Sequence, residues 1–140
     1  MTPLSDLKTA AIRASFAQQG MMQSLAATIL DLAPGRVRIA APIRAEVSQQ
    51  QGFAHAALAF ALGDSAAGYA ALSLMPEGAD VVTVEMKINL IAPALGERLV
   101  ATGDVLKAGR RITVVRAEVV AEGPGGTKTI ALLQGTMMPV

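Results

Sequence analysis

The stretch that decides the fold runs from Val47 to Pro76 and reads VSQQQGFAHAALAFALGDSAAGYAALSLMP. Its residues 53–73 are apolar on almost every side of a helical projection, which predicts a long helix enclosed by other elements. Asp64 is the one charged residue between positions 47 and 76. A carboxylate among apolar neighbours is costly unless it is paired or hydrogen-bonded. An acid kept in such a place predicts a chemical role.

The sequence on either side of this helix predicts strands and one further helix. Residues 4–18 indicate an amphipathic helix that Gly20 ends, and residues 25–42 indicate a hairpin with its turn at Pro34-Gly35. After Pro76 the apolar period changes to two, which is typical of a strand with one buried face. Strands are therefore expected at residues 82–90, 98–107, 111–122 and 127–138. The residues expected to face the core from the first of these are Val82, Val84, Met86, Ile88 and Leu90.

These elements predict an α+β fold in a single domain. An antiparallel sheet of five to six strands is expected to wrap around one long central helix, with a short N-terminal helix beside it. The domain is expected to span residues 1–140, with an N-terminal helical segment at 1–24 and the core at 25–140. A chain of 140 residues is long enough for one full hydrophobic core.

The composition excludes several classes of protein. A net charge of +1, with three phenylalanines and one tyrosine, gives no basis for binding nucleic acid or an anionic membrane. The absence of cysteine excludes disulfides and thiolate metal ligands, and the single histidine, His55, gives no poly-histidine metal site. Because 52% of the residues are hydrophobic and only 16% are charged, part of the surface is expected to be buried in an oligomer.

The sequence also bears on whether the protein is secreted, membrane-bound or cytoplasmic. The N-terminus lacks the charged-then-apolar order of a signal peptide, so a cytoplasmic protein is expected. Residues 53–75 are long and apolar enough to resemble a membrane span. Asp64 near the middle of that segment and the strand-like segments around it argue against a transmembrane helix.

The long helix carries two halves of a candidate catalytic site. The first N–H groups of a helix have no intrahelical partner, so those near His55 and Ala56 could hold a developing oxyanion. Asp64 could act as a general base or as a nucleophile. Ala56 and Asp64 are eight residues apart, or about 12 Å along a helix axis, so one chain cannot bring them together. Two antiparallel helices across a two-fold axis would do so, which predicts an obligate homodimer.

Five residues of this region resemble a known family. The spacing of Gly52, His55, Asp64, Ala66 and Gly68 resembles that of the hotdog-fold acyl-CoA thioesterases, in the branch named for phenylacetic-acid degradation (PaaI-like). The later segment VVTVEMKINLIAPALGERLVATGDVLKAGRR, residues 81–111, is similar to the strand and hairpin that follow the helix in that family. The resemblance covers roughly residues 25–138. It implies a hotdog fold and hydrolysis of an acyl-CoA thioester with an aromatic or medium-chain acyl group.

The resemblance also implies roles for single residues. Asp64 matches the acid that activates water or attacks the thioester, and Ala56 matches a glycine whose N–H polarises the carbonyl. Gln49 takes the place of an amide that orients water or substrate, and Thr83 that of a hydroxyl near the nucleophilic water. Coenzyme A would be part of the substrate, and no metal or other cofactor is needed. The residues expected to contact the substrate are Gly52, His55, Ala57, Lys107, Arg110 and Arg111.

The sequence departs from the family at its His-Gly-Gly signature, which here reads His55-Ala56-Ala57. Alanine keeps the N–H donor, but its methyl group would crowd a thioester that approaches the backbone closely. Simpler interpretations stay open for several residues: His55 as a structural histidine at the helix start, Gln49 as part of a solvated loop, and Lys107, Arg110 and Arg111 as solvated charges at a turn.

Two other functions are compatible with such a fold. One is a hydratase or dehydratase, although the residue order that we associate with those enzymes is absent. The other is a non-catalytic acyl-CoA binding module in which the change to His55-Ala56-Ala57 has weakened turnover. The sequence leaves open whether dimers pair further into tetramers.

Overall fold

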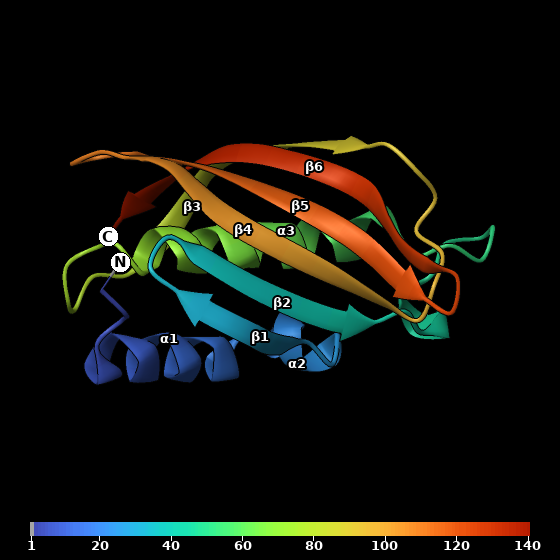
Figure 1. The fold of residues 1–140 in the computed structure, drawn as a ribbon, viewed down its shortest axis with the longest axis horizontal. Coiled ribbons are helices and arrows are strands. Elements are labelled where there is room, and N and C mark those ends of the chain that lie inside the picture. The colour runs from blue at the N-terminus through green and yellow to red at the C-terminus, as the bar shows by residue number, and fades with distance from the viewer. Residues whose placement is uncertain (1) are drawn as a thin grey trace.

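The computed structural model describes residues 2–140 and confirms an antiparallel sheet wrapped around one long helix (Figure 1). The six strands lie in the order β1-β2-β4-β5-β6-β3, so β1 and β3 form the two edges of the sheet. The elements in chain order are α1 (Asp6–Gln18), α2 (Gly20–Ser24), β1 (Thr28–Ala33), β2 (Arg36–Pro42), the short 3-10 helix η1 (Ala45–Val47), α3 (Ala56–Leu72), β3 (Val81–Leu90), β4 (Arg98–Ala108), β5 (Thr113–Gly123) and β6 (Gly126–Pro139).

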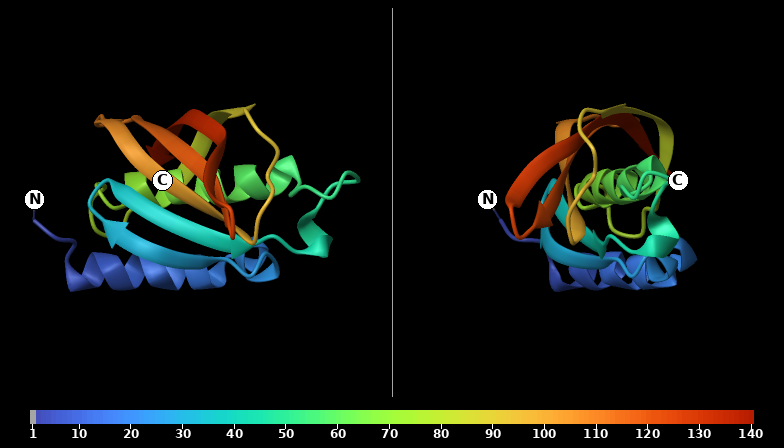
Figure 2. Two further views of the ribbon diagram at one scale, coloured as in Figure 1. Left: turned by 45° about the vertical axis from the view of Figure 1, so that its right-hand side comes forward. Right: turned by 90° about the vertical axis from the view of Figure 1, so that its right-hand side faces the viewer.

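Helix α3 packs into the hollow of the curved sheet, as the end-on view in Figure 2 shows. Small residues allow this close approach. A methyl group at Gly103 of β4 would overlap the backbone of Ala66 and Ala67, and one at Gly63 of α3 would lie 2.9 Å from the side chain of Leu133. The apolar residues that are completely or almost completely buried around the helix include Leu58, Leu62, Leu99, Val115 and Ile130. Burial of such side chains is the main term that stabilises the fold.

Helix α1 lies along a side of α3 that the sheet leaves uncovered (Figure 2). Ser5 caps its first turn by accepting a hydrogen bond from the Lys8 N–H. Ile12 is completely buried, and the buried Lys8 ammonium donates to the carbonyl oxygens of Met75 at 2.9 Å and Pro76 at 3.2 Å. Because a buried ammonium needs acceptors, these two bonds hold α1 against the segment that follows α3.

Two helix boundaries differ from the prediction. The long helix begins at Ala56 rather than at residue 53, because His55 has an extended backbone and caps the first turn. The N-terminal helix ends at Gln18, and Gly20, which was expected to end it, instead begins the short helix α2. Gln19 between them has an extended backbone, which separates the two helices.

Strand β3 contains a β-bulge that makes part of the core prediction wrong. Thr83 pairs with Met137 and Glu85 pairs with Thr136, so Val84 is an extra residue. The extra residue changes which side chains face the helix, because side chains alternate along a strand. Met86 and Ile88 pack against the core as predicted. The predicted core residues Val82 and Val84 are instead exposed, at 44% and 53% of their surface. Leu90, on the same side of the strand as Met86 and Ile88, is also exposed, at 54%, and lies at the end of this edge strand.

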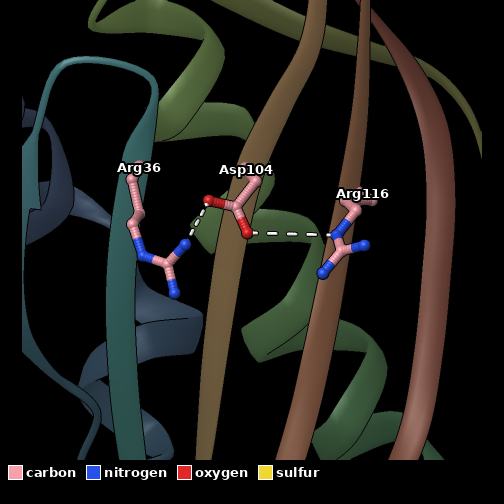
Figure 3. Close-up of polar contacts among 3 residues, drawn as sticks. All are labelled: Arg36, Asp104 and Arg116. Atoms are coloured by element: carbon pink, nitrogen blue, oxygen red, sulfur yellow. Dashed lines mark hydrogen bonds and ion pairs between the residues drawn. The ribbon is translucent and has the colours of Figure 1, made fainter.

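The outer face of the sheet is polar across three neighbouring strands. Arg36 of β2, Asp104 of β4 and Arg116 of β5 are direct cross-strand partners, and Asp104 lies between the two guanidinium groups at 2.8 and 4.0 Å (Figure 3). Both arginines are about half exposed, so these ion pairs contribute little to stability. They mark the solvent side of the sheet.

Among the described residues, no helix combines the length and the apolar character that a membrane crossing requires. The most apolar helix, α3, has 17 residues.

Candidate functional site

The start of α3 leaves one backbone donor free. The Nδ1 atom of His55 accepts the Ala57 N–H at 2.9 Å, and the His55 carbonyl oxygen accepts the Leu58 N–H at 3.0 Å. The Ala56 N–H has no hydrogen-bond acceptor anywhere in residues 2–140. Because Nδ1 accepts a bond, a neutral His55 carries its proton on Nε2. His55 therefore has the structural role of a helix cap, and Ala56 supplies the unpaired donor.

The loop before α3 is folded around Gln49. The Gln49 side-chain oxygen accepts the N–H groups of Gln51 and, at 3.3 Å, Phe53, while Gln49 and Phe53 also pair through their backbones. Gly52 closes this turn with a φ of +88°, a conformation that favours glycine. Gln49, His55 and Ala56 line one cavity of about 320 Å³. The structure thus brings these three predicted residues together at the helix start.

The remaining two predicted catalytic residues meet further along the helix. The Thr83 hydroxyl on β3 donates to the Asp64 Oδ1 at 2.7 Å and lies 3.3 Å from the Met137 sulfur. The bulge at Val84 allows this contact. Met86 and Ile88 face the helix, so strict alternation along β3 would turn Thr83 outward, and the extra residue turns it toward the helix instead. Burial raises the pKa of Asp64 above its ordinary value of 3.8, and the hydrogen bond from Thr83 partly offsets that rise.

A raised pKa makes the ionised carboxylate a stronger base, which suits removal of a proton from water. Asp64 is only partly buried, and Ala57, two turns earlier on the same side of α3, is exposed. Asp64 and Thr83 line a cavity of about 180 Å³ that does not include Ala56. Since α3 is continuous from Ala56 to Leu72, Ala56 and Asp64 lie about 12 Å apart along the axis. Each chain therefore holds the Ala56 N–H and the Asp64 carboxylate in two separate cavities.

The three predicted phosphate-binding cations lie elsewhere. Lys107, Arg110 and Arg111 are exposed on the hairpin between β4 and β5 and line neither of these two cavities. The base of that hairpin is level with Thr83, because Thr113 and Thr83 are both paired with Met137. Two strand spacings, about 10 Å, therefore separate Thr113 from Thr83.

The sequence reasoning did not identify three polar residues that line the Asp64 cavity. The Tyr69 hydroxyl of α3 lies 2.7 Å from the Gln19 amide nitrogen and 3.0 Å from the Ser15 hydroxyl, both from the N-terminal segment. Tyr69 is the one tyrosine of the chain, placed in an apolar helix, and a buried hydroxyl of that kind needs a partner. A lone tyrosine in an apolar helix therefore indicated a buried hydrogen bond in the sequence. Its partners could not be named, because they depend on how α1 packs.

Comparison with known proteins adds to this geometry. The family model of the thioesterase superfamily matches residues 51–128. A thioesterase family protein from Silicibacter pomeroyi has a crystal structure similar to this chain, with 43% identity, coverage of 95% of this chain and 98% of that one, and a TM-score of 0.93. The acyl-coenzyme A thioesterase 13 of Homo sapiens is 31% identical over 70% of each chain.

A mutant of the phenylacetic acid degradation protein PaaI from Thermus thermophilus is similar as well. Its structure is 32% identical, with coverage of 84% of this chain and 96% of that one, and a TM-score of 0.73. The predicted resemblance to hotdog thioesterases of the PaaI-like branch is confirmed by these matches.

Proposed function

Because the chain belongs to the thioesterase superfamily and is a thioesterase, we propose that its substrate is an acyl-coenzyme A and that Asp64 activates the attacking water. The observation that carries this proposal is the Asp64–Thr83 pair: a lone carboxylate in an uncharged helix, held at 2.7 Å by a hydroxyl. The similarity to acyl-coenzyme A thioesterase 13 supports the substrate class. The acyl group is proposed to be aromatic or of medium length.

In the proposed reaction, Asp64 takes a proton from a water molecule whose oxygen attacks the thioester carbonyl carbon. The carbonyl oxygen gains negative charge and accepts the N–H of Ala56 of the partner subunit. The tetrahedral intermediate then breaks its carbon–sulfur bond, and the proton held by Asp64 passes to the leaving thiolate. The products are the carboxylic acid and coenzyme A, with Asp64 ionised again. The Thr83 bond occupies Oδ1 of Asp64 and leaves Oδ2 available for the water. Direct attack by Asp64 on the carbonyl is the alternative, with water then hydrolysing the anhydride.

We propose a homodimer because the two half-sites are too far apart in one chain. The side of α3 that carries Asp64 also carries Ala57 and Ala61, whose small side chains are exposed or partly exposed. Beside it, the edge strand β3 exposes Val82 and Val84. An apolar strand edge next to a small-residue helix face suits contact with a second copy. Antiparallel α3 helices would then bring Asp64 toward Ala56 of the partner subunit.

The other predicted residues have supporting parts in this proposal. Gln49 shapes the loop at the helix start, and its amide nitrogen, now bonded to the exposed side chain of Gln51, could turn to a substrate oxygen. His55 keeps the helix start in place by accepting the Ala57 N–H. Gly52 and Ala57 are proposed to line the substrate path. Lys107, Arg110 and Arg111 are proposed to contact the phosphates of coenzyme A.

The test is release of free thiol from a panel of acyl-CoA compounds by the wild type and by Asp64→Asn. Asparagine keeps the acceptor for Thr83 but cannot take a proton, so the rate should fall by about 10²-fold or more. Asp31→Asn, at an exposed carboxylate on β1, is the matched control and should leave the rate unchanged. Equal rates in wild type and Asp64→Asn would contradict the assignment. Tight binding of acyl-CoA without thiol release would indicate a binding module instead.

A further inference from the structure

The Thr83 hydroxyl is in contact with two hydrogen-bond acceptors at once. Its oxygen lies 2.7 Å from the Oδ1 atom of Asp64 and 3.3 Å from the sulfur of Met137. A hydroxyl has one hydrogen, so it donates to one of the two at a time. A carboxylate is the stronger acceptor and a thioether sulfur the weaker one, so the hydrogen points to Asp64 while that group is ionised. The sulfur is then an acceptor in reserve.

The position of this sulfur is fixed by both the sheet and the central helix. Met137 on β6 is the direct cross-strand partner of Thr83 on β3, and it is completely buried. Its side chain also packs against Gly68, one turn after Asp64 on α3. A β-carbon at Gly68 would be in ordinary contact with Met137, 3.8 Å from its methyl carbon and 4.0 Å from its sulfur. A side chain packed on both sides has little freedom to move its sulfur away from the hydroxyl.

The second acceptor becomes important once Asp64 has taken a proton. A neutral carboxyl group is a weaker acceptor than a carboxylate, and a proton on Oδ1 would itself be donated to the Thr83 oxygen. Thr83 then needs another acceptor for its own hydrogen, and the Met137 sulfur is within reach. Among the described residues, the Thr83 hydroxyl has no third hydrogen-bond partner. The sulfur therefore stabilises the protonated form of Asp64 more than the ionised form.

Few other titratable groups face Asp64. Asp80 and Tyr69 line the same cavity, to which α1, β3 and β6 contribute only uncharged residues, and the lining includes no lysine, arginine or histidine. In the proposed dimer, the partner subunit's His55 would stand at the helix start that faces Asp64. Because these groups also titrate, the effect of the sulfur has to be measured with and without the Thr83 hydroxyl.

We propose that Met137 is a positioning residue for the proposed hydrolysis, because its sulfur takes the Thr83 hydrogen when Asp64 is protonated and so makes Asp64 a readier proton acceptor. Met137 acts through Thr83 rather than on the reacting atoms. The inference rests on the proposed role of Asp64 as the base. An apolar side chain at position 137 should lower the pKa of Asp64, because only the ionised form would then have the use of the Thr83 hydrogen.

The experiment measures the protonation of Asp64 in the wild type and in Met137→Leu, which removes the sulfur and nearly keeps the volume. The first readout is an NMR titration of the aspartate carboxyl carbons, in which the Asp64 resonance is identified by its absence in Asp64→Asn. The second is the pH dependence of kcat for thiol release from an acyl-CoA. Each midpoint should lie about half a pH unit lower in Met137→Leu, the size expected for one weak hydrogen bond. The same replacement on a Thr83→Val background should shift neither midpoint.

Two controls separate the sulfur from the packing of the side chain. Met22→Leu changes a methionine that is almost as deeply buried but does not line the Asp64 cavity, and it should leave both midpoints unchanged. Replacement of all methionines by norleucine exchanges each sulfur for a methylene group of similar shape. The norleucine protein should show the same downward shift, and it replaces Met137→Leu in the test if that variant does not fold.

Unchanged midpoints in Met137→Leu and in the norleucine protein would overturn this inference, and so would an equal shift on the Thr83→Val background. Thiol release that depends on Asp64, together with unchanged midpoints, would leave the proposed thioesterase chemistry intact. A shift in the NMR titration without thiol release from any acyl-CoA would instead support the action of the sulfur on Asp64 and overturn the proposed hydrolysis.

Discussion

Replacement of Ala56 by proline tests the free N–H at the start of α3. Ala56 is the first residue of the helix, where proline is well tolerated because the N–H there has no intrahelical partner. The preceding residue, His55, has φ −65° and ψ 145°, the backbone region that a residue before proline prefers. Ala56→Pro therefore removes one hydrogen-bond donor while the helix is expected to keep its fold.

The structure sets the size of the effect. The Ala57 and Leu58 N–H groups are already bonded to His55, so the two donors that follow Ala56 in the chain are not free to replace its N–H. Loss of one oxyanion donor lowers kcat by about 10²–10³-fold, or about 3–4 kcal/mol. We expect that loss for thiol release from the best acyl-CoA substrate, with little change in KM and an unchanged thermal midpoint. Ala56→Gly, which keeps the N–H, should retain the wild-type rate or exceed it.

The same variant tests the division of the site between two chains. Ala56→Pro and Asp64→Asn are each expected to be inactive alone. When equal amounts of the two variants are mixed and exchange subunits, half of the dimers contain one subunit of each variant. Each of these mixed dimers has one intact site and one that lacks both groups. About a quarter of the wild-type activity should therefore return. No recovery of activity despite demonstrated subunit exchange would refute the shared site, and a wild-type kcat for Ala56→Pro would refute the role of its N–H.

Three other perturbations follow from the structure. Thr83→Val removes the hydrogen bond that lowers the pKa of Asp64, so that pKa should rise. Because the base works only when ionised, the pH below which kcat declines should also rise, and an unchanged pH profile of kcat would contradict this. Gly103→Ala forces a methyl group against the backbone of α3 and should lower the free energy of unfolding, measured in denaturant, by about 3 kcal/mol or more. The control Gly125→Ala has open space around it and should leave the free energy of unfolding nearly unchanged. Lys8→Met leaves the buried Met75 carbonyl oxygen without a donor, whereas the Pro76 oxygen keeps the Ala79 N–H. The change should cost about 1–3 kcal/mol by the same measurement, and an unchanged midpoint would show that α1 docks without these bonds.

The sequence predicted the architecture because its patterns are local. The apolar run of 53–73 and the alternating segments after Pro76 identify the central helix and the strands without knowledge of their partners. The position of β3 at the sheet edge and the bulge at Val84 depend on pairing with β6, which no single strand encodes. The prediction therefore named the strand correctly and assigned the wrong face to Val82 and Val84.

The candidate site was likewise predictable only where a single segment carries the information. Asp64 was identifiable because a charge in an apolar helix is visible in one segment, and His55 because it is the only histidine. The Asp64–Thr83 hydrogen bond joins residues 19 positions apart and follows from the register of β3 against the helix. Tyr69, Ser15 and Gln19 come together only because α1 docks beside α3, through contacts between residues at least 50 positions apart. Their meeting was therefore not predictable from local patterns.

The change from glycine to alanine at position 56 has a limited physical meaning. Ala26 is the one residue other than glycine with a positive φ among the described residues, so Ala56 has a backbone conformation that alanine adopts without strain. The N–H remains and stays unpaired. The Ala56 methyl group instead reduces the space beside the N–H, in a cavity that Phe53 and Pro93 also line. A gain in rate for Ala56→Gly that is larger for acyl groups branched next to the carbonyl would therefore measure crowding. An equal gain for all acyl groups would instead indicate a better placed donor.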